Sequence, residues 1–103
     1  MNVIGIVSND VITKNRVMDS LGHQGFNVLN ISSVNFDPAG FDLILVDLES
    51  PMGELVLKNH AYKCMAFGSK DKPEQLERAR QFGCEKVYKH GEFFKKILPN
   101  FTL

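Results

Sequence analysis

The apolar residues of the chain gather in short runs, and the stretches between the runs are amphipathic or polar. The run 3–7 is apolar at odd and even positions alike, and the run 41–47 is apolar up to a terminal acid. Such runs are typical of strands buried on both faces of a sheet. We expect strands at 3–7, 26–31, 41–47, 62–67 and 86–88.

The segments between the strands carry helix signals. Asp10 is placed to cap the first helix, and Gly25 and Gly83 are placed to end the helices that precede them. The predicted helices are 11–24, 51–60, 71–82 and 91–98. The apolar stripe expected on the first helix consists of Val11, Asn15, Met18 and Leu21, with Val17 beside it.

The segment 32–40 is the exception, because it is too short for a crossover helix and contains two breakers, Pro38 and Gly40. We expect one helical turn there at most. The rest of the chain alternates strand and helix, which predicts one parallel sheet covered on both faces, with right-handed crossovers. The fold class is therefore α/β: a single flavodoxin-like three-layer domain over residues 1–103, strand order 2-1-3-4-5, with the second and third helices shortened.

In such sheets, ligands bind outside the carboxyl ends of the strands, near the point where the strand order reverses. That point lies between the first and third strands of this order. The expected crevice is lined by Ser8, Asn9, Asp10, Asp47, Gly68 and Ser69.

The charge of the chain narrows the class of partner. Lys and Arg number 12, Asp and Glu also number 12, and the net charge is zero, so no overall field attracts nucleic acid or an anionic membrane. No apolar run approaches the ~20 residues of a membrane helix. The first residues also lack the basic stretch and cleavage site of a signal peptide. We expect a cytoplasmic protein that binds neither nucleic acid nor membranes.

Metal-binding and redox motifs are weak. Cys64 and Cys84 are far apart and form no C-x-x-C pair, so we expect reduced thiols that pack in the core. His23, His60 and His90 fall at helix ends or in a loop, where a histidine is more often solvated or close to a helix C-terminus than a metal ligand.

Two segments resemble the receiver domains of response regulators. The run 42–47 ends in Asp47, and Pro51 follows four residues later, as in the third strand and following loop of receivers. The run 79–85 is similar to the end of the receiver's fourth helix. The resemblance implies that Asp47 accepts a phosphoryl group and that magnesium offsets the charge of the phosphoryl oxygens.

The metal side of the receiver pattern is altered. The acidic pair that ends the first strand of receivers falls on Ser8 and Asn9, and neither residue brings a negative charge. Asp10 is next along the chain, and Glu49 occupies the position whose backbone carbonyl helps to bind the ion. The resemblance therefore implies a magnesium set of Asn9, Asp10 and Glu49 if the site works at all.

The phosphoryl side is shifted as well. The receiver hydroxyl should end the fourth strand, where Gly68 stands, with Ser69 one residue later. The receiver lysine falls on His90, with Lys89 one residue before it. The implied phosphoryl contacts are Ser69, Lys89 and His90.

These departures resemble the degenerate receiver-like domains called pseudo-receivers, and the segments 67–69 and 92–99 resemble a small set of bacterial proteins of that kind. The resemblance predicts a non-catalytic signalling module without a cofactor that binds an unidentified protein partner. The predicted partner surface is Tyr88, Phe93 and Phe94, with one of the two phenylalanines partly exposed and a homodimer as one form of partner.

Two alternatives stay open. One is a working receiver that phosphorylates itself on Asp47 with magnesium. The other is a site for a small anion or a nucleotide between Gly68-Ser69 and the helix that starts at 71–73, although the chain has no glycine-rich phosphate loop.

Overall fold

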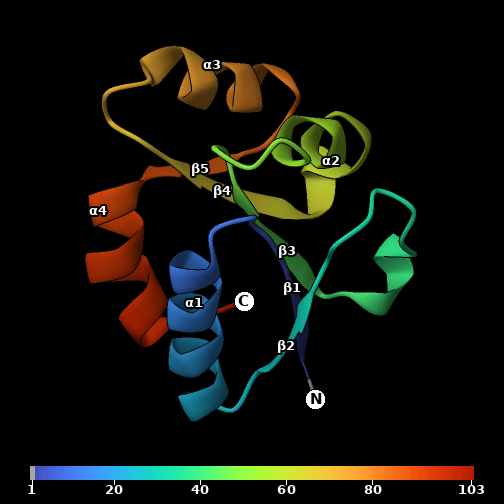
Figure 1. Ribbon diagram of the computed structural model, residues 1–103, viewed down its shortest axis with the longest axis vertical. Helices are drawn as coiled ribbons and strands as arrows, with labels where there is room; N and C mark the ends of the chain where they lie inside the picture. The colour runs from blue at the N-terminus through green and yellow to red at the C-terminus, as the bar shows by residue number, and fades with distance from the viewer. Residues whose placement is uncertain (1) are drawn as a thin grey trace.

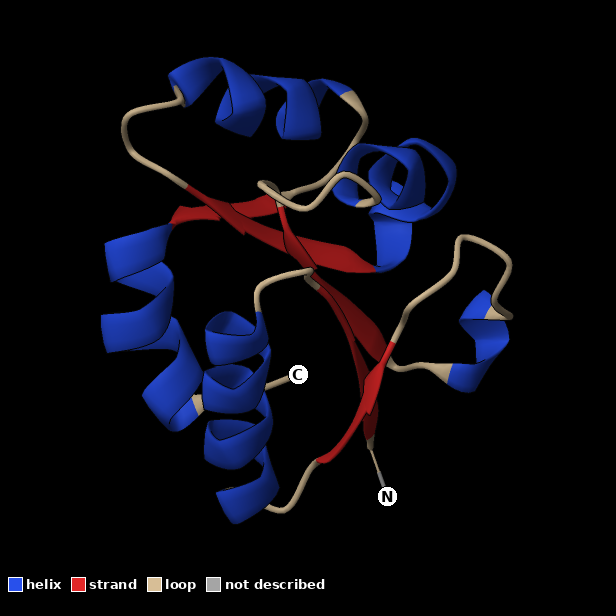
Figure 2. Ribbon diagram, in the orientation of Figure 1, coloured by secondary structure: helices blue, strands red, loops and turns tan. Residues whose placement is uncertain are grey.

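The computed structural model describes residues 2–103 and contains one five-stranded, fully parallel sheet (Figures 1 and 2). The strands are β1 (Val3–Val7), β2 (Asn27–Asn30), β3 (Leu43–Asp47), β4 (Cys64–Gly68) and β5 (Lys86–Lys89). Their order in the sheet is β2-β1-β3-β4-β5. The predicted α/β fold and strand order are confirmed.

Helices cover both faces of the sheet (Figure 1). On one face lie α1 (Val11–His23) and the C-terminal helical segment, which runs through α4 (His90–Glu92), a π-type turn (Phe93–Ile97) and a 3-10 turn (Leu98–Asn100). On the other face lie α2 (Gly53–His60) and α3 (Pro73–Gln81). None of the helices formed by residues 2–103 is long and apolar enough to cross a membrane.

Each face of the sheet has its own apolar core because successive strand side chains point in opposite directions. In β1, Ile4 and Ile6 pack under α1 and the C-terminal segment, whereas Val7 packs towards α2. β3 divides in the same way, with Leu45 on the first face and Val46 on the second. The runs that are apolar at both parities are thus the central strands, as expected.

The crossover between β2 and β3 contains no α-helix. A single 3-10 turn (Pro38–Gly40) occupies it, as expected for its length. Phe36 and Phe41 pack edge to face, with ring centroids 5.9 Å apart, and both lie against the second core in place of a helix. Gly5 lets Phe41 lie close to β1, because a Cβ there would lie 3.0 Å from Phe41 Cδ1 and 2.5 Å from Ile31 Cδ1.

The apolar stripe of α1 differs from the prediction. Thr13, Val17 and Leu21 are its buried residues, whereas Val11 is 61% exposed and Asn15 is exposed. The predicted stripe began at the first helical residue, but Asp10 caps the helix and turns that first residue towards solvent. The buried stripe therefore starts at Thr13.

Two other boundaries also differ. β4 begins at Cys64 rather than at 62, because Ala61–Lys63 form a 3-10 turn that leaves Tyr62 75% exposed. The helix predicted from residue 71 begins at Pro73, and Lys72 stands at its N-cap without a side-chain capping hydrogen bond.

The predicted exposure of one C-terminal phenylalanine is wrong. Phe93 is fully buried and Phe94 is 8% exposed. Phe93 stacks on Phe67 of β4 with ring centroids 4.5 Å apart, and Phe94 meets the same ring edge-on at 5.5 Å. The Arg16 guanidinium of α1 lies 4.2 Å from the Phe94 ring centre. Because the sheet and α1 each supply a cover, both phenylalanines belong to the core, and Tyr88 is half-buried against it.

The packing role predicted for the cysteines is confirmed, since Cys64 and Cys84 are free thiols buried in the second core. Burial, reinforced by the neighbouring Cys84, raises the pKa of Cys64 from its ordinary 9.0 to about 12. Burial also raises the pKa of Cys84.

We expect Gly25→Ala to destabilise the protein by about 1 kcal/mol and Gly22→Ala to stabilise it by about 0.5 kcal/mol. Gly25 has φ +91°, which strains any residue with a Cβ, whereas Gly22 lies within α1 and its Cβ would meet no atom within 4 Å. Urea unfolding of both variants measures the difference. Equal effects would contradict the positive-φ assignment.

Cys64 should resist alkylation by iodoacetamide at pH 8.5 in the folded protein and react once urea unfolds the chain, as followed by intact mass. The raised pKa keeps the thiol protonated, and the thiolate is the reactive form. Because the pKa of Cys64 is higher in the folded chain than in the unfolded one, protonation of this thiol favours the folded state. This contribution to the free energy of unfolding is fully present below pH 9 and is lost as the pH rises through 12. Rapid alkylation of the folded protein would contradict the assignment.

Candidate functional site

The predicted crevice falls at the carboxyl ends of β1 and β3, which are neighbouring strands in the middle of the sheet. The register pairs Val7 with Val46, so Ser8 and Asp47 come next to each other at this edge. Ser8 Oγ donates a hydrogen bond of 2.8 Å to Asp47 Oδ2, and the backbone N–H of Glu49 donates one of 3.0 Å to Asp47 Oδ1. Asp47 is only 3% exposed. Both of its carboxylate oxygens are therefore engaged within the protein.

The same network includes Asp10. Its backbone N–H donates to Ser8 Oγ at 3.2 Å. Its side chain caps α1, as predicted, and accepts hydrogen bonds from Ile12 N at 3.2 Å and from Thr13 Oγ1 at 2.7 Å. Each side-chain oxygen of Asp10 thus has a partner inside the first turn of the helix.

This donor set does not fit a magnesium ion. Magnesium prefers an octahedral set of oxygen ligands that includes carboxylates. The carboxylate oxygens of Asp47 and Asp10 already accept hydrogen bonds from within the protein. Glu49 turns to Lys72, whose Nζ lies 3.1 Å from its Oε1, and Asn9 is exposed. Among residues 2–103, no three acidic, histidine or cysteine side chains are grouped to hold one ion.

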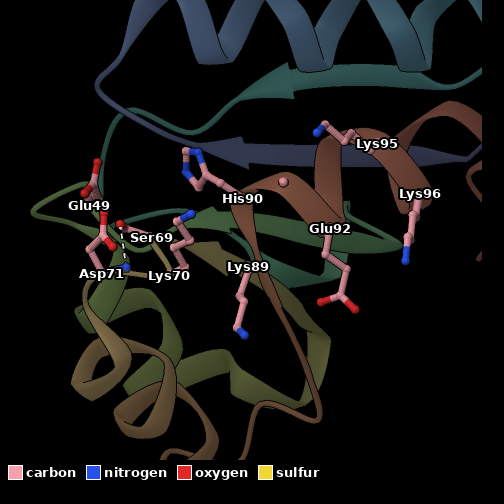
Figure 3. Close-up of a pocket in the computed structure, with 10 residues that line it drawn as sticks. Glu49, Ser69, Lys70, Asp71, Lys89, His90, Glu92, Lys95 and Lys96 are labelled. Atoms are coloured by element: carbon pink, nitrogen blue, oxygen red, sulfur yellow. Dashed lines mark hydrogen bonds between the residues drawn. The ribbon is translucent and has the colours of Figure 1, made fainter.

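The residues predicted to contact a phosphoryl group line a separate pocket of about 670 Å³ at the carboxyl ends of β4 and β5 (Figure 3). Ser69 follows β4 and accepts a 3.1 Å hydrogen bond from the N–H of Asp71. Lys89 ends β5, and His90 begins α4. We call this the lysine pocket; it is lined by Glu49, Ser69, Lys70, Asp71, Lys89, His90, Gly91, Glu92, Lys95 and Lys96.

The predicted site is thus divided into two parts. Ser8, Asp10 and Asp47 share one hydrogen-bond network, whereas Ser69, Lys89, His90 and Glu49 line the lysine pocket. Asp47 does not line that pocket.

Sequence reasoning missed several lining residues, chiefly Lys70, Lys95 and Lys96. Lys70 lies two residues beyond β4, and Lys95-Lys96 follow β5 within the helical segment. The available signal was their position, since both segments follow strands whose carboxyl ends meet at the same edge of a parallel sheet.

Comparison with known proteins gives a likeness at the level of structure. No family model matches the sequence, and no curated protein matches it. A response regulator from Thermotoga maritima superposes with a TM-score of 0.70 at 14% identity, over 95% of this chain and 92% of that one. The receiver domain of HemR from Leptospira biflexa gives 0.70 at 16% identity, over 98% and 100%.

A CheY-like receiver domain from Methanospirillum hungatei gives a TM-score of 0.71 at 18% identity, over 96% of this chain and 85% of that one. The chain has the receiver fold. Within this fold, Asp47 stands at the end of the central strand β3, and the polar residues at the ends of β1, β4 and β5 surround the same edge of the sheet.

We expect Ser8→Ala to destabilise this receiver fold by about 1.5–3 kcal/mol in urea unfolding, because the change leaves one oxygen of the buried Asp47 without its donor. Ser32→Ala is the matched control: Ser32 is exposed, and its loss should change stability by less than about 0.5 kcal/mol. A Ser8→Ala variant as stable as this control would show that the hydrogen bond contributes little.

Proposed function

We propose that this receiver-fold domain is a non-catalytic signalling module that acts through protein contacts and is not phosphorylated on Asp47. The observation that carries the proposal is the hydrogen bond from Ser8 to the buried Asp47. A hydroxyl stands there in place of the acid that receiver chemistry needs.

Electrostatics supports this proposal. A carboxylate that attacks a phosphoryl group meets three charged oxygens, and the reaction depends on a cation to offset them. The crevice supplies a neutral hydroxyl from Ser8 and the carboxylate of Asp10, which caps α1. Among the described residues, Asp47 has no ion-pair partner. A cation bound there would compete with the hydrogen bonds that the two acids already accept.

The second support comes from His90, which stands where the resemblance places a lysine. Its ring lies 5.3 Å from that of Phe67 and 5.5 Å from that of Phe94, so aromatic neighbours hold it against the core. A short, packed imidazole cannot extend as a lysine does to an oxygen several ångströms away. The groups that would hold a phosphoryl group on Asp47 are therefore replaced on both sides.

A protein partner is favoured by the surface beside the crevice. Val11 and Ile12, the first residues of α1, directly follow Asp10 and are 61% and 78% exposed. Adjacent apolar side chains left in solvent are a feature of interaction surfaces. We place the domain in bacterial two-component signalling in the cytoplasm, with a protein partner that is either another signalling protein or a second copy of this chain.

The alternative is a working receiver that phosphorylates itself on Asp47 with magnesium held by Asn9, Asp10 and Glu49. The position of Asp47 favours it, since the acid ends β3 at the edge of the sheet where ligands bind in this class of fold.

The deciding experiment adds magnesium, and then beryllofluoride as a phosphoryl mimic, to the ¹⁵N-labelled protein, with acetyl phosphate and intact mass as a second readout. We expect no focused shifts at Ser8, Asp47 or Ser69 and no phosphoryl adduct, because Ser8 and Asn9 replace the acidic pair and Asp47 is already hydrogen-bonded within the protein.

The matched variant is Ser8→Asp/Asn9→Asp, which restores an acidic pair and should gain magnesium-dependent shifts in the crevice. A phosphoryl adduct on the unmodified protein that disappears in Asp47→Asn would overturn the proposal and establish the alternative.

A further inference from the structure

The lysine pocket plays no part in the proposed function. Its wall is built mainly from two segments that are distant in the sequence, and Glu49 from a third segment completes it (Figure 3). The two main segments are the loop after β4, which carries Ser69 and Lys70, and the segment from Lys89 to Lys96. Its volume of about 670 Å³ falls in the range of small-molecule sites, roughly 300–1,000 Å³.

The pocket is locally basic although the chain is neutral. Four of the nine lysines of the chain line it: Lys70, Lys89, Lys95 and Lys96. Within residues 2–103, none of these four has a carboxylate at ion-pair distance.

Three carboxylates also line the pocket, which weakens its positive potential without cancelling it. Glu49 is already paired with Lys72, at 3.1 Å, which leaves Asp71 and Glu92 against the four free ammonium groups. Because the excess charge is confined to one concave site, it attracts anions there rather than over the whole surface.

His90 adds an observation of a different kind. Its Nε2 is buried and has no hydrogen-bond partner within the described chain. Buried polar atoms normally have a partner, and the few that lack one need an explanation, such as a water, an ion or a ligand. The ring lies 5.3 Å from that of Phe67 and 5.5 Å from that of Phe94, and His90 is one of the residues that line the pocket.

Ser69 supplies a further donor at the wall. Its Oγ accepts the N–H of Asp71, and in residues 2–103 its own O–H is donated to no protein acceptor. A hydroxyl with an unused proton, an imidazole nitrogen and several ammonium groups all suit the oxygens of a phosphate group.

We propose that the lysine pocket binds, without covalent chemistry, a phosphate-bearing small molecule of about the size of a mononucleotide. Lys70 and Lys95 approach from the two walls and hold the phosphate, His90 Nε2 and the Ser69 hydroxyl donate to its oxygens, and the remaining volume holds the organic part. The inference does not rest on the proposed function, because Asp47 lies outside the pocket.

The test is a ¹H–¹⁵N titration at constant ionic strength with four probes: AMP, pyrophosphate, adenosine and sodium sulfate. We expect saturable shifts at Ser69–Asp71 and Lys89–Glu92 with AMP, weaker ones with pyrophosphate, and none with adenosine. AMP binding much tighter than pyrophosphate binding identifies an organic phosphate. Equal affinity would confine the site to inorganic phosphate and overturn the organic part of the proposal.

The variant Lys70→Gln/Lys95→Gln should weaken AMP binding at least tenfold, since each change removes a charged donor. Lys58→Gln/Lys86→Gln removes the same charge away from the pocket and should leave the affinity within about twofold, because distant exposed charges are screened by salt. His90→Phe keeps a ring between Phe67 and Phe94 but removes the nitrogen, and it should weaken binding as well.

Sulfate shifts as large as those of AMP, unchanged in Lys70→Gln/Lys95→Gln, would mean an adventitious ion only and overturn the proposal. Equal losses in both double variants, or no shifts with any probe, would also overturn it. AMP binding retained in Asp47→Asn separates this site from phosphorylation of Asp47, whatever becomes of the proposed function.

Discussion

The burial of the central strands on both faces is the constraint on which the rest of the structure depends. β1, β3 and β4 lie inside the sheet and under helices, so their side chains are apolar almost throughout. Polar side chains are therefore found at the ends of these strands rather than along them. In a parallel sheet, the carboxyl ends all meet at one edge, which is why Ser8, Asp47 and Ser69 all lie at this edge although they are far apart in the sequence.

At that edge, the Ser8 hydroxyl donates a hydrogen bond to the buried carboxylate of Asp47. A buried carboxylate needs hydrogen bonds or a cation to offset the loss of water. Ser8 and the N–H of Glu49 meet this need for Asp47 from within the protein. An acid at position 8 would instead add like charge and create a demand for a cation. Under the proposed function, the difference from a metal-dependent receiver thus rests on the two uncharged residues that follow β1, Ser8 and Asn9.

The two halves of the sheet edge differ in character. Around Asp47, hydrogen bonds inside the protein satisfy the polar atoms. Around the ends of β4 and β5, the pocket lysines have no ion-pair partner among residues 2–103. The buried Nε2 of His90 likewise has no hydrogen-bond partner among these residues. Unsatisfied polar groups and unpaired charges mark places that suit a molecule from outside, which is why we propose the ligand site of this fold at β4 and β5 rather than at β3.

The sequence by itself determined the order of strands and helices, the fold class, the absence of a full helix between β2 and β3, the capping role of Asp10 and the helix stops at Gly25 and Gly83. These features follow from the hydrophobic periodicity and from local backbone preferences, both of which depend only on residues close together in the sequence.

Only the tertiary structure decided that the Ser8 hydroxyl meets Asp47, that Phe93 and Phe94 are both buried, and that Lys70 and Lys95 line one pocket. Each of these depends on the direction of side chains and on the contact of segments far apart in the chain. Neither the side-chain directions nor these long-range contacts can be predicted from the sequence, because both are fixed only when the strands pair and the helices pack on the sheet.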